Sequence, residues 1–300
     1  MIAPRRFLPS ISSLLAIEAV ERLGSASAAA DELSLSHSAV SRQLKVLEDQ
    51  IGVAMFRRQG KGLALTPAGA EYAQSVRDCL HDLARASLKI KVGGQSASLS
   101  LATLPAFGMR WLGPRLRDFT ASHPGITVHI GTRLSPFDFT RDKFDAAIHF
   151  GQRDWPGADY LELVRERVIP ACAPALIGGR RPQPADLLTM PLLHLESRPG
   201  AWEDWFEAHG AHPGQLRGML FDQFVPMAEA AALGFGVALL PEFLARDEFA
   251  QGRLVPAGAG YLDIAASYYL VWPANAAPGQ SLGLFLNWFR RTVQPKLLQA

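Results

Sequence analysis

Six polar side chains recur on one face of a helix that the pattern predicts over residues 37–50. They are Ser36, His37, Ser38, Ser41, Arg42 and Lys45. Their hydroxyl, imidazole, guanidinium and ammonium groups suit base edges and phosphates, and a helix fits the major groove of duplex DNA. We therefore expect Ser38, Ser41 and Arg42 near bases and the other three at phosphates. The alternative is that each is an ordinary solvated side chain.

Short helices would have to hold this polar face in place. The opposite face of the same helix is apolar at helical spacing, with Val40, Leu44, Leu47 and Ile51. Ser36 is a candidate N-cap because its hydroxyl can accept from backbone N–H groups, and Gly52 ends the helix. Two further helices are predicted at 10–23 and 27–33, so the pattern indicates a small helical domain.

A basic hairpin is predicted after these helices. Residues 55–66 contain two short strands around the glycine-containing tip Gln59–Gly62. Arg58 and Lys61 would lie at this tip, where they could reach a DNA backbone or minor groove. The hairpin would then be a wing beside the DNA-reading helix.

A long helix is predicted from Pro67 to about Val92, because Thr66 and Pro67 supply a cap and a proline at the first helical position. Its apolar seam has alternating spacings of four and three, at Tyr72, Val76, Cys79, Leu83, Ala86 and Ile90. Such a seam usually pairs with another helix, so these are candidate dimerisation residues. The alternative is that the helix packs on its own domain.

Beyond residue 97 the pattern changes to strands that alternate with helices. Strands are predicted at 99–104, 126–133, 145–150, 192–195, 219–222, 237–240 and 266–272. Helices are predicted at 112–122, 201–209, 224–233 and 281–293. This alternation is typical of parallel sheets covered by helices, in one sheet or in two lobes. If there are two lobes, Pro170–Pro174 and Ser267–Pro273 are candidate crossovers.

The N-terminal residues also carry a family resemblance. It rests on Ala28, Ala29 and Leu33, on SAVSRQLKVLEDQIGVAMFRR from Ser38 to Arg58, and on LALTPAG from Leu63 to Gly69. This segment resembles the winged helix-turn-helix of LysR-type transcriptional regulators. The resemblance implies an α/β protein with a DNA-binding domain at 1–66, a dimerising linker helix at 67–92 and an effector-binding domain at 93–300. That last domain would be two-lobed, like a periplasmic binding protein, with lobe I at about 97–168 and 269–300 and lobe II at about 169–268.

A later segment points to one subgroup of this family. FDAAIHFGQRDWPGA, from Phe144 to Ala158, resembles the subgroup that includes regulators of glycine cleavage and of inducible β-lactamase. That subgroup usually has arginine and an aromatic residue before the glycine, where this sequence has His149 and Phe150. Ala26 and His37 also depart from the commoner residues of the reading head. We therefore transfer neither an effector nor an operator from the subgroup.

The resemblance implies a ligand cleft between the lobes, at strand C-terminal ends and helix N-termini. Six residues of this sequence would reach such a cleft, namely Thr103, Thr132, His149, Phe150, His194 and Asp222. All but Phe150 and His194 occupy typical effector-contact positions by resemblance. The alternative is that individual members only bind backbone, or cap a helix as Asp222 could.

Composition restricts the other classes of protein. The formal charge is only +2, so any DNA binding must be local, and residues 1–92 carry 12 basic against 9 acidic side chains. Cys79 and Cys172 are too few and too far apart for a disulfide framework or a structural zinc site. We expect no cofactor and no metal. No GxSxG, HExxH or P-loop motif occurs, so we do not expect an enzyme.

The N-terminus resembles a secretory signal only superficially, because Glu18, Glu21 and Arg22 interrupt the apolar stretch. With no window of 18 apolar residues, we expect a cytoplasmic protein with no membrane partner. The expected partners are double-stranded promoter DNA, a second copy of the chain in a dimer or tetramer, and a small-molecule effector. The effector could be amino-acid-like, an organic acid or a peptide, and RNA polymerase is a further candidate partner. The rival interpretations are a solute-binding protein without a regulatory role and an α/β enzyme.

Overall fold

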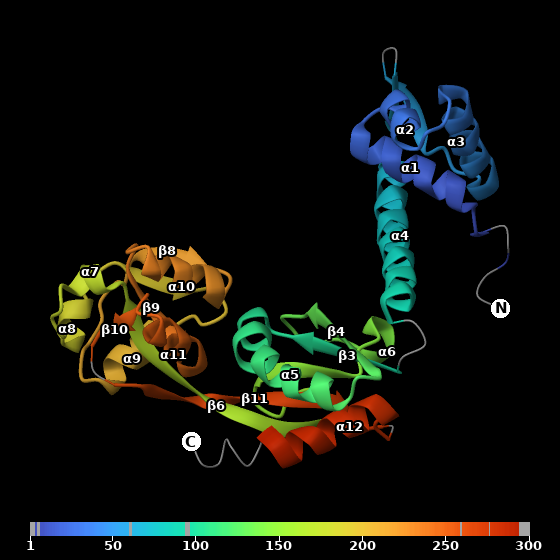
Figure 1. The fold of residues 1–300 in the computed structure, drawn as a ribbon. Coiled ribbons are helices and arrows are strands. Elements are labelled where there is room, and N and C mark those ends of the chain that lie inside the picture. Colours follow the sequence, from blue (N-terminus) through green and yellow to red (C-terminus); the bar gives the residue numbers. More distant parts are fainter. Residues whose placement is uncertain are drawn as a thin grey trace. The chain divides into compact units, whose positions relative to one another are not determined.

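The computed structural model divides the chain into two compact units, Met1–Gln95 and Ser96–Ala300 (Figure 1). It describes Pro4 and residues 7–59, 62–93, 97–258, 260–275 and 277–293. The first unit contains the predicted small helical domain, which we call the head, and the long helix that follows it. The second unit contains the predicted alternation of strands and helices.

Three helices build the head, as the apolar spacing predicts. They are α1 (Ile11–Leu23), α2 (Ala26–Glu32) and α3 (His37–Ile51). Ser10, Ser25 and Ser36 cap them, because each hydroxyl accepts a hydrogen bond from the backbone N–H three residues later. The buried residues of α3 are Val40, Leu44 and Leu47, which share one apolar core with Ile17 and Val20 of α1. Ile51 is only partly buried against this core.

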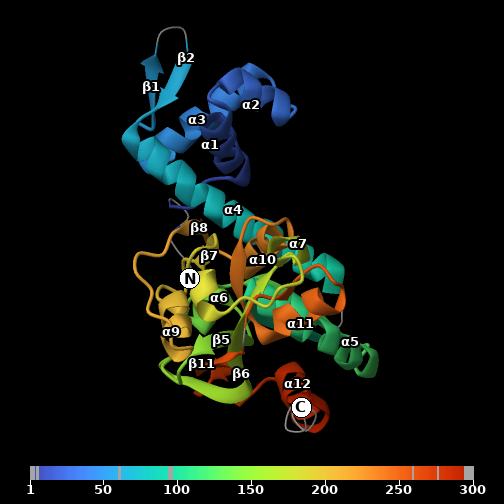
Figure 2. The same cartoon turned by 90° about the vertical axis from the view of Figure 1, so that its left-hand side faces the viewer.

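A hairpin follows α3 and confirms the predicted pair of strands. β1 (Phe56–Gln59) and β2 (Gly62–Leu65) pair antiparallel, and Figure 2 shows them side by side at one end of the head. The carboxylate of Glu48 in α3 accepts hydrogen bonds from the backbone N–H groups of Met55 and Phe56, at 2.7 and 3.0 Å. This buttress fixes the start of the hairpin relative to the end of α3.

The long helix α4 (Pro67–Gly93) packs on the head only at its beginning. Val76 is 5% exposed within the head's own core and Tyr72 packs against it, whereas Leu83 and Ile90 are 52% and 74% exposed. The predicted seam is therefore corrected at its first two residues, which the head itself covers. Cys79 is exposed.

Ion pairs also fasten α4 to α1. Arg77 of α4 bonds to the carboxylates of Glu18 and Glu21, and Arg22 bonds to Glu18 from the same helix. Burial alone would raise the pKa of Glu18, but the hydrogen bonds from Arg22 and Arg77 outweigh it and hold that pKa below its ordinary value. Glu18 therefore stays ionised, and its ion pair with Arg77 connects α1 to α4.

The second unit is built on one curled sheet with strand order β4-β3-β5-β11-β6-β9-β7-β8, and β10 pairs with β6. The strands are β3 (Ala97–Thr103), β4 (Ile126–Thr132), β5 (Ala146–Gly151), β6 (Ala158–Cys172), β7 (Leu192–Leu195), β8 (Gly218–Phe221), β9 (Val237–Pro241), β10 (Val255–Pro256) and β11 (Leu262–Pro273). All seven predicted strands are present. The parallel pairing that the alternation predicts is found at β3, β4 and β5 and at β7, β8 and β9, whereas β11 and β6 run antiparallel to their neighbours.

The two antiparallel strands are also the longest, and they join two lobes (Figure 1). β6 was not predicted, because charged residues and Pro170 interrupt its apolar alternation. The helices of lobe I are a π-helix at Phe107–Leu112, α5 (Gly113–Ser122), α6 (Phe139–Asp142), α12 (Gln280–Trp288) and a second π-helix at Phe289–Val293. Those of lobe II are α7 (Pro174–Ile177), α8 (Pro184–Leu187), α9 (Ala201–Ala208), α10 (Phe224–Ala232) and α11 (Glu242–Ala250). Five of these helices have no counterpart among the predicted ones, namely the first π-helix, α6, α7, α8 and α11.

A buried carboxylate ties the lobes together beside the strands. Glu248 of α11 is 0% exposed and accepts hydrogen bonds from Arg253 in its own lobe, at 2.6 and 2.7 Å. It also accepts one from Arg110 of the first π-helix in lobe I, at 3.2 Å. Arg253 continues the network to Glu229 of α10 at 2.8 Å. Because Arg253 alone can neutralise Glu248, the bond from Arg110 can break without leaving a buried charge unpaired.

This asymmetry predicts unequal costs for two similar substitutions. Arg253→Met should destabilise the second unit by about 3 kcal/mol, because it leaves a buried carboxylate without its main partner. Arg110→Met should cost only about 1 kcal/mol, the typical value of one lost hydrogen bond. All six tryptophans lie between Trp111 and Trp288, so tryptophan fluorescence during urea unfolding reports on this unit. Equal losses for the two variants would contradict the inferred network.

Candidate nucleic-acid interface and ligand pocket

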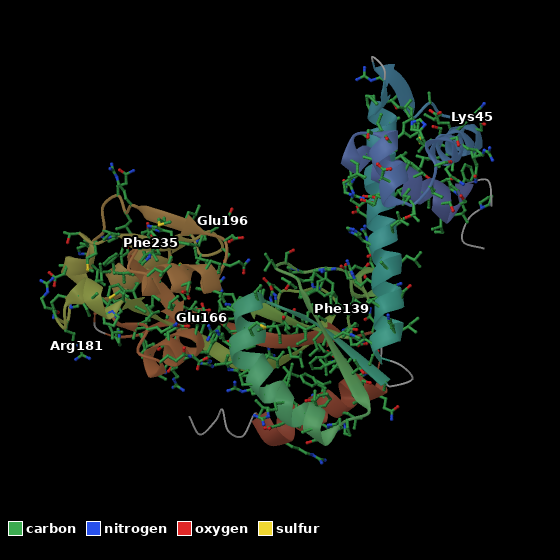
Figure 3. All side chains as sticks on the ribbon, turned by 45° about the horizontal axis from the view of Figure 1, so that its top comes forward. Lys45, Phe139, Glu166, Arg181, Glu196 and Phe235 are labelled. Carbon is green, nitrogen blue, oxygen red and sulfur yellow. The ribbon has the colours of Figure 1, made fainter. Side chains whose placement is uncertain are left out.

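The structure leaves the six predicted polar residues of α3 in solvent. Ser36, His37, Ser38, Ser41, Arg42 and Lys45 are all exposed. Figure 3 shows Lys45 at the outer surface of the head. Within the described residues, Arg42 and Lys45 have no carboxylate partner, so their charges are available. The hydroxyl of Ser36 accepts a hydrogen bond from the backbone N–H of Ala39 at 3.2 Å and shares another with the hydroxyl of Ser38 at 3.0 Å.

The predicted wing residues lie outside what the structure describes. Arg58 belongs to β1 by its backbone, but its side chain is not described, and Lys61 is not described at all. Both therefore stay predictions.

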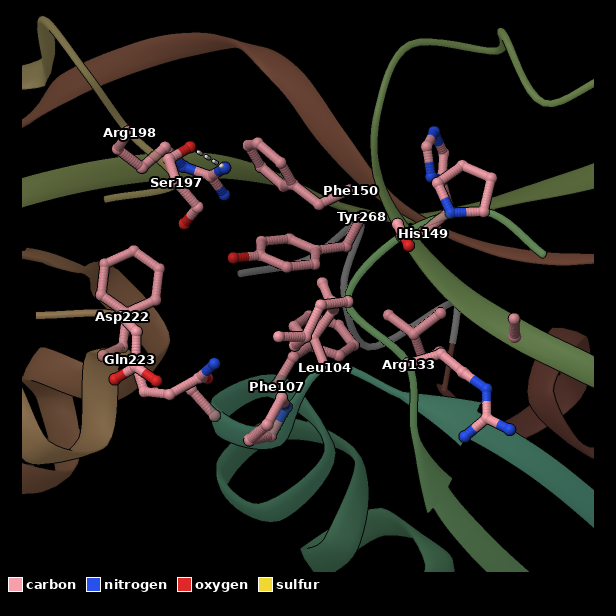
Figure 4. A pocket seen from close by; sticks show the side chains of 18 of the residues that line it. Leu104, Phe107, Arg133, His149, Phe150, Ser197, Arg198, Asp222, Gln223 and Tyr268 are labelled. Carbon is pink, nitrogen blue, oxygen red and sulfur yellow. Dashed lines mark hydrogen bonds between the residues drawn. The ribbon is translucent and has the colours of Figure 1, made fainter. Parts of the chain in front are cut away.

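A pocket lies between the lobes of the second unit, with a cavity volume of about 170 Å³. An apolar cavity of roughly 150 Å³ is large enough for benzene, so this one suits a small ligand. Aromatic rings dominate its wall, with Phe107, Phe137, Phe150, Trp155, Phe224 and Tyr268. Its charged residues are Arg133, Arg198 and Asp222, which come from both lobes (Figure 4).

The pocket brings together three of the six predicted effector residues. His149, Phe150 and Asp222 line it. Thr103 does not, because it is 3% exposed and packs so closely on Gly108 that a Cβ there would lie 2.5 Å from its hydroxyl. Thr132 is an exposed residue at the end of β4 and is also not part of the lining.

His194 lines a second cavity, in lobe II, of about 600 Å³. That cavity shares Leu195, Arg198 and Phe224 with the first one. The Nε2 atom of His194 is buried and has no hydrogen-bond partner among the described residues. His194 therefore lies beside the predicted cleft, with a different set of neighbours.

His149 organises one wall of the pocket. Its Nε2 lies 3.0 Å from the carbonyl oxygen of Gln152 and 3.0 Å from Oδ1 of Asp154. Both neighbours are acceptors, so the hydrogen bonds assign the proton to Nε2. The ring meets Trp155 edge to face at a centroid distance of 5.6 Å. His149 thereby holds the loop after β5 against the pocket.

Sequence reasoning missed the buried polar group at the back of the pocket. Tyr268 of β11 donates a hydrogen bond to Glu166 of β6 at 2.6 Å, and each residue is 2% exposed. Burial raises the pKa of Glu166 above its ordinary value, and Arg198 and the bond from Tyr268 offset only part of this. The signal that could have found Tyr268 is its place in the predicted strand 266–272. Glu166 had no such signal because β6 was not predicted.

Comparisons with known proteins agree with this architecture. Residues 11–70 match the bacterial regulatory helix-turn-helix of the LysR family, and residues 93–294 match the LysR substrate binding domain. The chain belongs to the LysR family of transcriptional regulators. It is a LysR-type DNA-binding regulator with an effector-binding domain, in agreement with the resemblance seen in its sequence.

Relatives from the expected subgroup are among those the chain resembles. It is 36% identical to the transcriptional regulator TrpI of Pseudomonas aeruginosa over 290 residues, or 95% of this chain and 98% of the relative. It is 34% identical to the glycine cleavage system transcriptional activator of Escherichia coli K12, over 94% of this chain and 93% of that one. These relatives are regulators of transcription.

Solved structures show the same fold. The effector domain of AmpR from Pseudomonas aeruginosa matches with a TM-score of 0.61 at 30% identity, over 67% of this chain and 98% of that one. Full-length CbnR bound to its target DNA matches with a TM-score of 0.69 at 21% identity, over 94% of this chain and 99% of that one. Among the described residues of this regulator, no helix is long and apolar enough to cross a membrane, and no three His, Cys, Asp or Glu side chains are grouped so that they could hold a metal ion.

Removing the carboxyl group of Glu166 should stabilise the effector domain at neutral pH. In the unfolded chain a glutamate ionises near its ordinary pKa of 4.5, whereas the buried Glu166 resists ionisation. The wild type therefore loses stability as the pH rises from 4.5 through the raised pKa, and Glu166→Gln does not. Urea unfolding at a series of pH values should show the advantage of the variant growing across this window. An advantage that does not change with pH would contradict the assigned burial effect.

Proposed function

We propose that this regulator reads promoter DNA with the exposed face of α3 and that a small effector bound between the lobes alters that reading. The observation that carries the proposal is the exposed polar face of α3 over a buried apolar stripe, with Arg42 and Lys45 lacking a carboxylate partner among the described residues. Ser38, Ser41 and Arg42 are proposed to lie near bases. Ser36, His37, Lys45, Arg58 and Lys61 are proposed to contact phosphates.

The effector is proposed to occupy the pocket that His149, Phe150 and Asp222 line. A ligand there would contact both lobes, so it could favour one arrangement of the lobes through its differential affinity. An amino-acid-like molecule, an organic acid and a short peptide all remain within this proposal. We propose that residues 1–66 form the DNA-binding domain, residues 67–92 the dimerising linker helix and residues 93–300 the effector-binding domain.

Self-association is proposed through the exposed part of α4. Cys79, Leu83 and Ile90 continue the apolar seam beyond the head, and both aliphatic residues lie in solvent. Pairing two such helices would bury this seam and present two reading heads to DNA. We propose a dimer or tetramer that acts in the cytoplasm, with RNA polymerase as a further partner at promoters.

The DNA-reading proposal predicts different losses for two substitutions in α3. Duplexes selected from a random library by the wild type serve as ligands, with binding followed by fluorescence anisotropy at several salt concentrations. Arg42→Ala should cost about 1–3 kcal/mol on selected duplexes and much less on unrelated ones. Lys45→Ala should weaken both and lower the slope of log K against log salt by about one.

The matched control is Arg85→Ala, which removes an exposed arginine of α4 outside the reading face. It should leave both the affinity for selected duplexes and the salt slope close to those of the wild type. The proposed face would be wrong if Arg42→Ala and Lys45→Ala behaved like this control. Failure of the wild type to select any duplex would remove the proposal altogether.

The seam proposal predicts that a charge in α4 dissociates the assembly. Leu83→Asp places a carboxylate in the seam and should convert the protein to monomers at concentrations where the wild type is dimeric or larger. His81→Asp introduces the same side chain on the opposite face of the helix and should leave the assembly intact. Analytical ultracentrifugation measures both, and an unchanged Leu83→Asp assembly would contradict the seam.

A further inference from the structure

Arg198 is a cation of the effector pocket that the predicted site did not include. It follows β7, in the loop before α9, and its guanidinium carbon lies 3.6 Å from the ring centroid of Phe150. A second ring, that of Phe224, lies 5.9 Å away. The side chain is 24% exposed. Figure 4 shows Arg198 with Ser197, Asp222 and Gln223 on the lobe II side of the pocket.

The hydrogen-bond donors of Arg198 are largely unused. Its Nε atom is buried without a hydrogen-bond partner among the described residues, and Oε2 of Glu166 forms an ion pair with it at 3.6 Å, which is too long for a hydrogen bond. Nη1 reaches only the carbonyl oxygen of Ser197, at 3.4 Å. A guanidinium has five N–H donors, and the described residues use them only in the bond to Ser197 and the long ion pair with Glu166.

The other groups near Arg198 do not supply those acceptors. Glu166 supplies only a long ion pair, because its Oε1 accepts from Tyr268 at 2.6 Å and its Oε2 lies 3.6 Å from Nε of Arg198. Arg133, the second arginine of the pocket, differs from Arg198 because it is satisfied by Asp142 at 2.7 and 3.0 Å. Arg198 is therefore the under-used cation among the described residues of the lining.

The rest of the lining restricts the size and charge of a ligand that could supply hydrogen-bond acceptors to Arg198. The walls are mainly aromatic, and the cavity of about 170 Å³ holds a body of about benzene size. Asp222 adds a negative charge to the same lining, which disfavours a doubly charged phosphate more than a singly charged carboxylate. A carboxylate also matches the planar fork of a guanidinium with two parallel hydrogen bonds.

We propose that Arg198 receives the carboxylate of the effector, and that the effector is a small carboxylic acid with an apolar body about the size of a benzene ring. This inference rests on the proposed function, because it names the ligand class of the same pocket. Glu166 then acts as a competitor within the protein, since its carboxyl group forms the 3.6 Å ion pair with the same guanidinium. The ligand would supply the acceptors that Glu166 does not.

The test measures binding of three acids and their neutral counterparts to the intact protein by thermal shift and calorimetry. The acids are benzoate, phenylacetate and isovalerate, the counterparts are the three primary amides, and phenyl phosphate tests the doubly charged oxyanion. At least one acid should bind, and at least ten times more tightly than its amide and than phenyl phosphate. Binding by none of the acids, or equal binding of acid and amide, overturns the proposal. Preferential binding of phenyl phosphate overturns the carboxylate assignment.

Three variants separate a direct contact from a structural role. Arg198→Lys keeps the charge but loses the fork, and should weaken the acid about tenfold while leaving the amide unchanged. Glu166→Gln removes the competing carboxylate and should strengthen acid binding, which a merely damaged pocket could not do. Arg217→Met, outside the first pocket, should change nothing. Weaker acid binding by Glu166→Gln would overturn the competition.

Selection of duplex DNA from the random library is measured on the same protein preparations. This second measurement distinguishes failure of the ligand proposal from failure of the proposed function. If the acids fail to bind while the protein still selects duplex DNA, the ligand class is wrong and the regulator remains. If the protein selects no DNA, the proposed reading of promoters fails whatever binds to the pocket.

Discussion

Burial of one apolar stripe decides what α3 can present to its surroundings. Val40, Leu44 and Leu47 are almost fully buried against α1, and each contributes roughly 1.5–3 kcal/mol by leaving water. Successive residues of a helix are separated by about 100°, so any rotation of α3 that exposed this stripe would bury Arg42 or Lys45. Packing of the core therefore determines which face of α3 is exposed to solvent. The hydrogen bonds that Glu48 accepts from Met55 and Phe56 then hold the start of the hairpin beside α3. The residues proposed to read DNA are free to vary because the core does not use them.

The effector domain depends on a different constraint, which is the pair of long strands shared by both lobes. β6 and β11 are antiparallel over most of their length, and the buried bond between Glu166 and Tyr268 connects them near the pocket. Phe107 stacks on Tyr268 at 4.2 Å and meets Phe243 of α11 edge to face at 5.4 Å. A ligand that moves one of these rings therefore acts on both lobes at once.

The head could be predicted almost completely from the sequence because its signals are local. Serine caps, helical spacing and a glycine tip each depend on residues close in the chain, and the structure agrees with them at α1, α2, α3 and the hairpin. The split of the α4 seam could not be predicted, because whether Val76 faces the head or another helix depends on tertiary packing. The 27-residue helix carries one continuous pattern over both environments.

The effector pocket was only partly predictable for a related reason. His149, Phe150 and Asp222 follow recognisable strands, or lie at their ends, and the rule about strand ends therefore found them. Thr103 obeys the same rule but is covered by Gly108, a contact between a strand and the following π-helix. Glu166 lies on β6, whose charged residues conceal its alternation. Arg198 lies in the loop between β7 and α9, where strand and helix patterns do not show which cavity a loop side chain enters. Non-local pairing carries this information, and a single sequence does not display it.

The proposed entry of α3 into the major groove can be measured by methylation interference on a selected duplex. Dimethyl sulfate methylates guanine at N7, in the major groove, and adenine at N3, in the minor groove. We expect guanine methylation within each half-site to prevent binding and adenine methylation there to have little effect. Interference from adenines alone, with methylated guanines tolerated throughout both half-sites, would contradict entry of α3 into the major groove.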